Sequence, residues 1–173
     1  VPLAWELAMG GLELIYDFFE DHLRAAAHIE ESRPLALGLF CFLAGGVSLF
    51  VAQALSQRLF ILSFSWTSLA LTLMWKLCAG LLLTALLHLI LDLAGAKGSA
   101  ASLFVLLGMS SLVWGMAVPL ILIARLASSG SSLAMGAIFL VIGLLSLSLK
   151  ARSVQDIYHI SSGKAWLTLS IPY

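Results

Sequence analysis

Four long runs of mainly apolar residues dominate this sequence and limit what it can fold into. They cover residues 35–54, 68–94, 102–124 and 133–149, and a fifth run begins near Lys164. A helix needs about 20 such residues to cross a bilayer, and it satisfies its own peptide groups where lipid offers them no partner. We therefore predict an all-α, polytopic transmembrane helical bundle with about five spans and an N-terminal amphipathic helix.

The composition agrees with a membrane protein and argues against an ordinary soluble domain or a nucleic-acid-binding protein. Hydrophobic residues make up 61% of the 173 residues and charged residues 10%, whereas an ordinary soluble domain is about one-quarter charged. The nine basic and nine acidic residues cancel, so no nucleic-acid partner is expected. The chain starts with Val1, and its last apolar run stops at Tyr173, short of the about 20 residues of a span. We expect it to be part of a longer protein.

Residues 1–34 differ from the bundle of residues 35–173 because they are rich in carboxylates. At about 100° per residue, one set of charged side chains falls on a single helix face. That set is Glu6, Glu13, Asp17, Glu20, Arg24 and Glu31. The opposite face is apolar and includes Leu14 and Phe18. We predict one acidic amphipathic helix that lies at the cytoplasmic membrane interface or against a partner protein.

Basic residues in the connections predict the orientation. With an odd number of spans, six lysines and arginines fall on the side of the N-terminus and three on the other side. The six are Arg24, Arg33, Lys97, Lys150, Arg152 and Lys164, and the three are Arg58, Arg125 and Lys76. Because loops on the cytoplasmic side are enriched in basic residues, we expect the N-terminus in the cytoplasm.

Small side chains form a stripe on three of the predicted spans, where they would let helix backbones approach. In chain order the stripes are Cys41, Gly45, Ser48 and Ala52; Gly108, Ser111, Gly115 and Pro119; and Ser132, Gly136, Gly143 and Ser146. We expect these faces to contact other helices, with Gly45, Gly115 and Gly143 too close to a neighbour for a larger side chain. Pro119 also lacks an amide hydrogen for the carbonyl of Gly115, so we expect the third span to bend.

The second span holds a candidate intramembrane polar site. Thr84, His88 and Asp92 recur every four positions and share one drifting helix face. Ionisable groups at membrane depth usually serve a function, so one interpretation is a small transporter or permeation protein with a polar path. In the other, Asp92 lies at the interface, Lys76 extends outward, and His88 makes one hydrogen bond to a hydroxyl or carbonyl of the third or fourth span. We favour the second, because burying a neutral imidazole costs less than burying an unpaired imidazolium.

The sequence carries no catalytic or cofactor-binding motif that we identify. It has no Gly-x-Ser-x-Gly, His-Glu-x-x-His or paired-cysteine motif, and the stretch from Ser161 to Lys164 lacks the upstream glycine of a phosphate-binding loop. His22, His28 and His159 lie outside the spans, so a bis-histidine haem site is not expected. We expect a non-enzymatic protein without metal or cofactor.

Two polar turns have a characteristic order relative to the spans. The first runs from His88 to Ser99 and contains Gly95-Ala96-Lys97-Gly98, and the second runs from Ser153 to Ala165 and ends in Ser161-Ser162-Gly163-Lys164-Ala165. With Pro119 late in the span between them, they resemble the Yip family of Rab/Ypt-interacting, five-span membrane proteins. The resemblance covers roughly residues 85–173.

The resemblance implies five spans and a cytoplasmic N-terminus. Eukaryotic members of the family bind prenylated Rab-type small GTPases and other Yip-like proteins in membrane trafficking between the endoplasmic reticulum and the Golgi, and bacterial relatives lack this machinery. We therefore expect an assembly or adaptor subunit in a lipid membrane. Its expected partners are other membrane protein subunits or further copies of itself, with small GTPases added in a eukaryote. The expected location is the inner membrane of a bacterium, or the endoplasmic reticulum and Golgi of a eukaryote.

Overall fold

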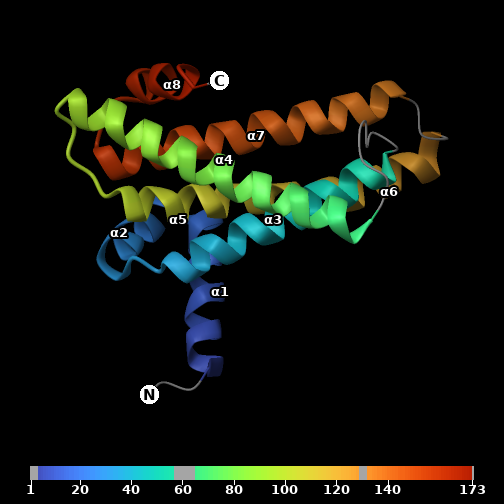
Figure 1. Cartoon of the computed structure of the whole chain (residues 1–173), viewed down its shortest axis with the longest axis horizontal. Coiled ribbons are helices and arrows are strands. Elements are labelled where there is room, and N and C mark those ends of the chain that lie inside the picture. The colour runs from blue at the N-terminus through green and yellow to red at the C-terminus, as the bar shows by residue number, and fades with distance from the viewer. Residues whose placement is uncertain (1–3, 57–64, 129–131, 173) are drawn as a thin grey trace.

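The computed structural model describes residues 4–56, 65–128 and 132–172 (Figure 1). These residues form an all-helical structure, and four of the described helices are long and apolar enough to cross a membrane. The predicted all-α class is therefore confirmed, and helices that could span a membrane are present. Such helices are compatible with an integral membrane protein.

The candidate spans begin close to where the apolar runs begin. The first is α3 (Leu35–Leu55), the second is α4 (Trp66–Leu93), the third covers Ala100–Leu126, and the fourth is α7 (Ser132–Tyr158). Figure 1 shows these long helices side by side, all running along the long axis of the molecule. After a short turn, α8 (Ser162–Ser170) lies where the fifth run was predicted to begin.

Helix α7 continues well beyond its predicted end at Leu149. The sequence predicts a polar turn from Ser153 to Ala165, but Val154, Ile157 and Tyr158 are buried against the rest of the bundle. Their spacing keeps one apolar face on the helix, which therefore persists through residues that are polar in composition. It ends before His159, whose φ of 51° is left-handed and cannot continue a helix.

The third span changes its winding in the middle. It consists of α5 (Ala100–Ser111), the 3-10 helix η1 (Leu112–Met116) and α6 (Ala117–Ser128). Pro119 has no amide hydrogen for the carbonyl of Gly115, so the regular hydrogen-bond ladder is interrupted where η1 lies. The side chain of Pro119 is exposed. The expectation that it packs with the small residues of its stripe is therefore wrong.

The N-terminal segment forms two helices where one was expected. They are α1 (Ala4–Glu20) and α2 (His22–Ser32), and Asp21 separates them. The amide of Arg24 donates a 3.3 Å hydrogen bond to the carboxylate of Asp21, which caps the start of α2. Aspartate is a favoured residue at this position because it satisfies an amide that the helix leaves unpaired.

The backbones of α3 and α5 lie in direct contact, and this is the most extensive helix pair of the described structure. A Cβ added at Gly108 would lie 2.5 Å from the carbonyl oxygen of Gly38, and one added at Gly45 would collide with the carbonyl of Ser111. Cys41 and Ala52, on the same stripe of α3, are fully buried. The small residues of the first and third spans thus lie against each other's backbone, and the rings of Phe42 and Phe104 pack beside them.

The other small residues are packed less closely than expected. Around Gly115, only the hydroxyl of Ser48 comes near an added Cβ, at an ordinary 3.9 Å. On α7, Ser146 is buried and its hydroxyl donates a 3.4 Å hydrogen bond to the carbonyl of Ser110, but Gly136 is half-buried and Ser132 is exposed. An added Cβ at Gly143 would meet nothing within 4 Å. The close contact predicted at Gly143 is wrong because this residue lines a cavity.

The two kinds of glycine give a direct test of the α3–α5 contact. Gly45→Ala should lower the free energy of unfolding by about 1–3 kcal/mol, because its methyl group requires a backbone to shift. Gly143→Ala is the matched control and should be neutral or slightly stabilising, since it adds a helix-favouring residue in open space. Thermal unfolding of both variants in detergent checks this prediction, and equal melting temperatures would contradict it.

Candidate functional site

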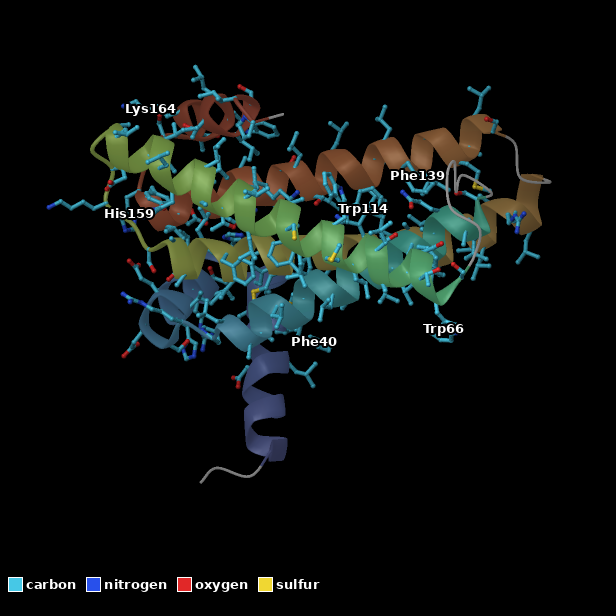
Figure 2. The ribbon with its side chains drawn as sticks, in the orientation of Figure 1. Phe40, Trp66, Trp114, Phe139, His159 and Lys164 are labelled. Atoms are coloured by element: carbon cyan, nitrogen blue, oxygen red, sulfur yellow. The ribbon has the colours of Figure 1, made fainter. Side chains whose placement is uncertain are left out.

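Polar side chains from three helices gather at one end of the bundle. We call this group the polar end and define it as His22 of α2, His88 of α4, and Asp156 and Tyr158 of α7. Figure 2 shows His159, the residue after α7, at this end of the molecule and Trp66, the first residue of α4, at the other. Because α4 and α7 run in the same direction, their last turns both reach this end.

His88 shares a hydrogen bond with the hydroxyl of Tyr158. The Nδ1–Oη distance is 2.6 Å, and the Tyr158 side chain is buried. The phenol ring also packs against Gly98, where an added Cβ would lie 2.7 Å from the ring. The partner is a hydroxyl on the helix of the fourth span, as the structural interpretation of His88 expected, but it lies beyond the predicted end of that span.

The structure does not bring Thr84, His88 and Asp92 together into one site. The hydroxyl of Thr84 is buried and donates a 2.8 Å hydrogen bond to the carbonyl of Gly80 in its own helix. His88 contacts Tyr158, and Asp92 is exposed. The three side chains therefore have three different surroundings, although they share a helix face.

A second pair in the polar end was not predicted from the sequence. The Nδ1 atom of His22 lies 2.6 Å from the Oδ2 atom of Asp156, and their side chains are only 8% and 9% exposed. The ring of Phe18 lies over the imidazole, with 4.5 Å between ring centres. These contacts fasten α2 to the extended part of α7.

Sequence reasoning missed this pair because it placed His22 on a surface helix and Asp156 in a turn, 134 positions apart. One signal was available. Val154 and Ile157 flank Asp156 at helical spacing, which indicates a helix that carries a carboxylate on or beside its buried face.

Burial keeps His22 neutral against the pull of its partner. Loss of hydration lowers the pKa of His22 below its ordinary value of 6.5, and the positive charge of Arg152 lowers it further, whereas the Asp156 carboxylate raises it. In the neutral form the Nδ1–H group donates to the carboxylate. The other ring nitrogen, Nε2, is buried without a hydrogen-bond partner among the described residues.

The chemistry available to the polar end is that of hydrogen bonding between helices. Its groups join α2 and α4 to α7, each by one short bond. Within the part of the chain that the structure describes, no group of three histidine, cysteine or acidic side chains could hold a metal ion.

In comparisons with known proteins, no family model, no curated protein and no solved structure matches the chain.

The bond between His88 and Tyr158 can be tested by removing one hydroxyl. Tyr158→Phe should lower the free energy of unfolding by about 1 kcal/mol, because it leaves a partly buried imidazole without its partner. His88→Gln, which keeps a hydrogen-bonding side chain, should cost less. Tyr16→Phe is the control, since Tyr16 is 64% exposed. If thermal unfolding in detergent gives Tyr158→Phe the stability of Tyr16→Phe, the bond contributes nothing.

The attachment of α2 should weaken in acid. The pKa of His22 is lower in the folded state than in the unfolded state, so the unfolded state binds more protons between the two values and stability rises with pH in that window. The stabilisation is complete above the ordinary pKa of 6.5 and is lost as the pH falls below it. We expect faster amide hydrogen exchange in α2, relative to intrinsic rates, at about pH 5.5 than at about pH 7. His22→Gln should remove this difference, whereas His28→Gln, at an exposed position of the same helix, should keep it.

Proposed function

We propose that this chain is a non-enzymatic assembly or adaptor subunit of a membrane, and that it holds a partner protein through helix α1. The observation that carries the proposal is the position of this helix. Figure 1 shows α1 running across the direction of the long helices and extending away from them. A helix that crosses the direction of the spans lies along the membrane plane, where it can reach a neighbouring protein.

Helix α1 is attached near its C-terminal end, and its outer face is exposed from Leu12 to Phe19. Leu14 and Phe18 are buried in the main core cluster, and α2 packs against both α5 and α7. The outer face of α1 carries large apolar side chains, with Leu12 65%, Tyr16 64% and Phe19 52% exposed. Exposed apolar side chains on an anchored helix are typical of a docking surface.

Charge favours a protein partner over the lipid surface. From Ala4 to Glu20 the helix contains four carboxylates and no lysine or arginine. A membrane surface rich in anionic lipid repels such a helix, and surface-bound helices usually carry basic residues instead. The expected partner therefore presents an apolar patch with basic residues around it, either on another membrane subunit or on a second copy of this chain.

The Yip resemblance of residues 85–173 supports the same class. We extend the proposal to the topology of that family, with five spans, the N-terminus and α1 in the cytoplasm, and α8 as the start of the fifth span. In a eukaryotic cell, a prenylated small GTPase would then be a candidate partner for α1. In a bacterium, the partner would be another inner-membrane protein.

The experiment is to extract the protein from its own membrane in mild detergent and to measure its complexes by native mass spectrometry. We expect a stable complex that is lost in the double variant Leu12→Ser and Phe19→Ser, because the apolar contact area is removed. Leu93→Ser is the matched control, since Leu93 is 80% exposed at the end of α4, and it should keep the complex. A complex that survives the double variant would overturn the docking role of α1. A protein extracted without any partner would overturn the whole proposal and favour the transport alternative.

A further inference from the structure

A polar cavity lies between the extended part of α7 and helix α8. Its volume is about 420 Å³, within the range of small-molecule pockets, about 300–1,000 Å³. The residues that line it are Ser148, Ala151, Arg152 and Gln155 of α7 and Ser162 and Trp166 of α8. Polar side chains therefore prevail in this lining, although the chain as a whole is 61% hydrophobic.

Each of the two helices contributes one regular face to the cavity. Ser148, Arg152 and Gln155 follow one another at spacings of four and three residues, which places them on one face of α7. Ser162 and Trp166 are four residues apart and share one face of α8. The two helices pack against each other. The cavity is therefore formed by regular helices that hold its polar groups in fixed positions.

The length of α7 places this cavity at the level of the lipid headgroups. Arg152 follows Ser132, the first residue of α7, by twenty positions, which corresponds to about 30 Å of helix. The apolar layer of a bilayer has about the same thickness, so Arg152 lies at one surface when Ser132 lies at the other. Trp166 is 41% exposed, and tryptophan is enriched at this level of a membrane. Figure 2 shows Lys164 of α8 at the same end of the molecule as His159.

Arg152 gives the cavity a positive charge that the described chain does not pair. Its guanidinium group has no hydrogen-bond or ion-pair partner among the described residues, and the residue is exposed, so a ligand can reach it. The carboxylate one turn further along, that of Asp156, is bound to His22 at 2.6 Å. The described lining contains no aspartate or glutamate, and α8 carries Lys164 and no carboxylate. An anion is therefore the ligand that the charge of this cavity attracts.

The hydrogen-bond donors of the cavity match a phosphate group. A guanidinium group donates two parallel hydrogen bonds to a phosphate, and the Gln155 amide and the Ser162 hydroxyl are further donors in the same lining. The side chain of Ser161 does not cap α8, and the amides of a helix N-terminus also favour an anion. A phosphate has more oxygens than a carboxylate to accept from so many donors. We propose that this cavity binds a phosphate group, that of an anionic phospholipid or of a soluble phosphate, with Arg152 as its main contact. This ligand site goes beyond the assembly role proposed for α1.

Isothermal titration calorimetry of the full chain in a non-ionic detergent tests the site. The probes are phosphatidic acid and diacylglycerol with the same acyl chains, which differ only in the phosphate group, and inorganic phosphate at constant ionic strength. We expect saturable binding of phosphatidic acid at concentrations where diacylglycerol gives none. Weaker binding of inorganic phosphate would identify a lipid headgroup as the ligand. Inorganic phosphate that binds as tightly as phosphatidic acid, or more tightly, would identify a soluble phosphate.

Variants of the lining decide whether this cavity is responsible. Arg152→Gln should weaken binding of the phosphate probe about tenfold or more, as expected for loss of a charge-assisted contact. Arg125→Gln is the matched control, at an exposed position near the end of α6, and should leave binding unchanged. Gln155→Glu places a carboxylate in the cavity and should abolish binding, which preserves the test if Arg152→Gln does not fold.

Three results would overturn the proposal. The first is that neither phosphate probe binds more tightly than diacylglycerol. The second is that binding is unchanged in both Arg152→Gln and Gln155→Glu. The third is that Arg125→Gln weakens binding as much as Arg152→Gln, because the attraction would then come from the overall charge of the protein and not from this cavity.

Discussion

The contact between the backbones of α3 and α5 is the constraint on which the rest of the bundle depends. Lipid tails are as apolar as leucine, so spans gain nothing by hiding leucines from them, and association must come from close packing and polar contacts. Gly38 and Gly45 provide that closeness against the backbone of α5. The buried face of α5 then leaves its other sides for α4, α2 and α7, which all pack on it. The third span is accordingly more buried than the second and the fourth.

The polar end fixes which parts of the packed helices lie together. Close contact of small residues holds helices together, but it fixes their ends weakly, whereas a hydrogen bond joins two defined atoms. His88 sets the end of α4 against Tyr158, and His22 sets α2 against Asp156, so one turn of α7 receives two other helices. The position of α1 follows from the attachment of α2. The proposed docking helix α1 is thus held by its own buried residues Leu14 and Phe18 and by the His22–Asp156 pair of the helix that follows it.

Much of the architecture could be predicted from the sequence, and the reason is physical. Spans are recognised from the number of consecutive apolar residues, a local property, and α3, α4 and the third span begin within about two residues of the predicted positions, within the scatter of helix assignment. The stripe containing Gly45 could also be predicted, because small residues at helical spacing are a local pattern in the sequence. The predictions that failed concern which neighbouring helix a residue faces, and this is not a local property of the sequence. Gly143 has the same local pattern as Gly45, yet its helix faces a cavity at that point.

The polar residues were harder to interpret because their cost depends on surroundings that only the fold supplies. Thr84, His88 and Asp92 share one helix face, but their polar groups have different surroundings. Thr84 bonds to its own helix, His88 bonds to Tyr158, and Asp92 is exposed. Lys76 was assigned outward because a long side chain can usually reach water. In the structure the ring of Trp114 holds it over the middle of the bundle.

The buried titratable groups of the polar end show how this chain offsets the cost of their burial. At the polar end, His22 is kept neutral and its N–H group meets a carboxylate, so the cost of burial is already offset within the chain. An internal pair of this kind stabilises the fold and needs no ligand from outside the chain. This is why the polar end is interpreted as a joint between helices.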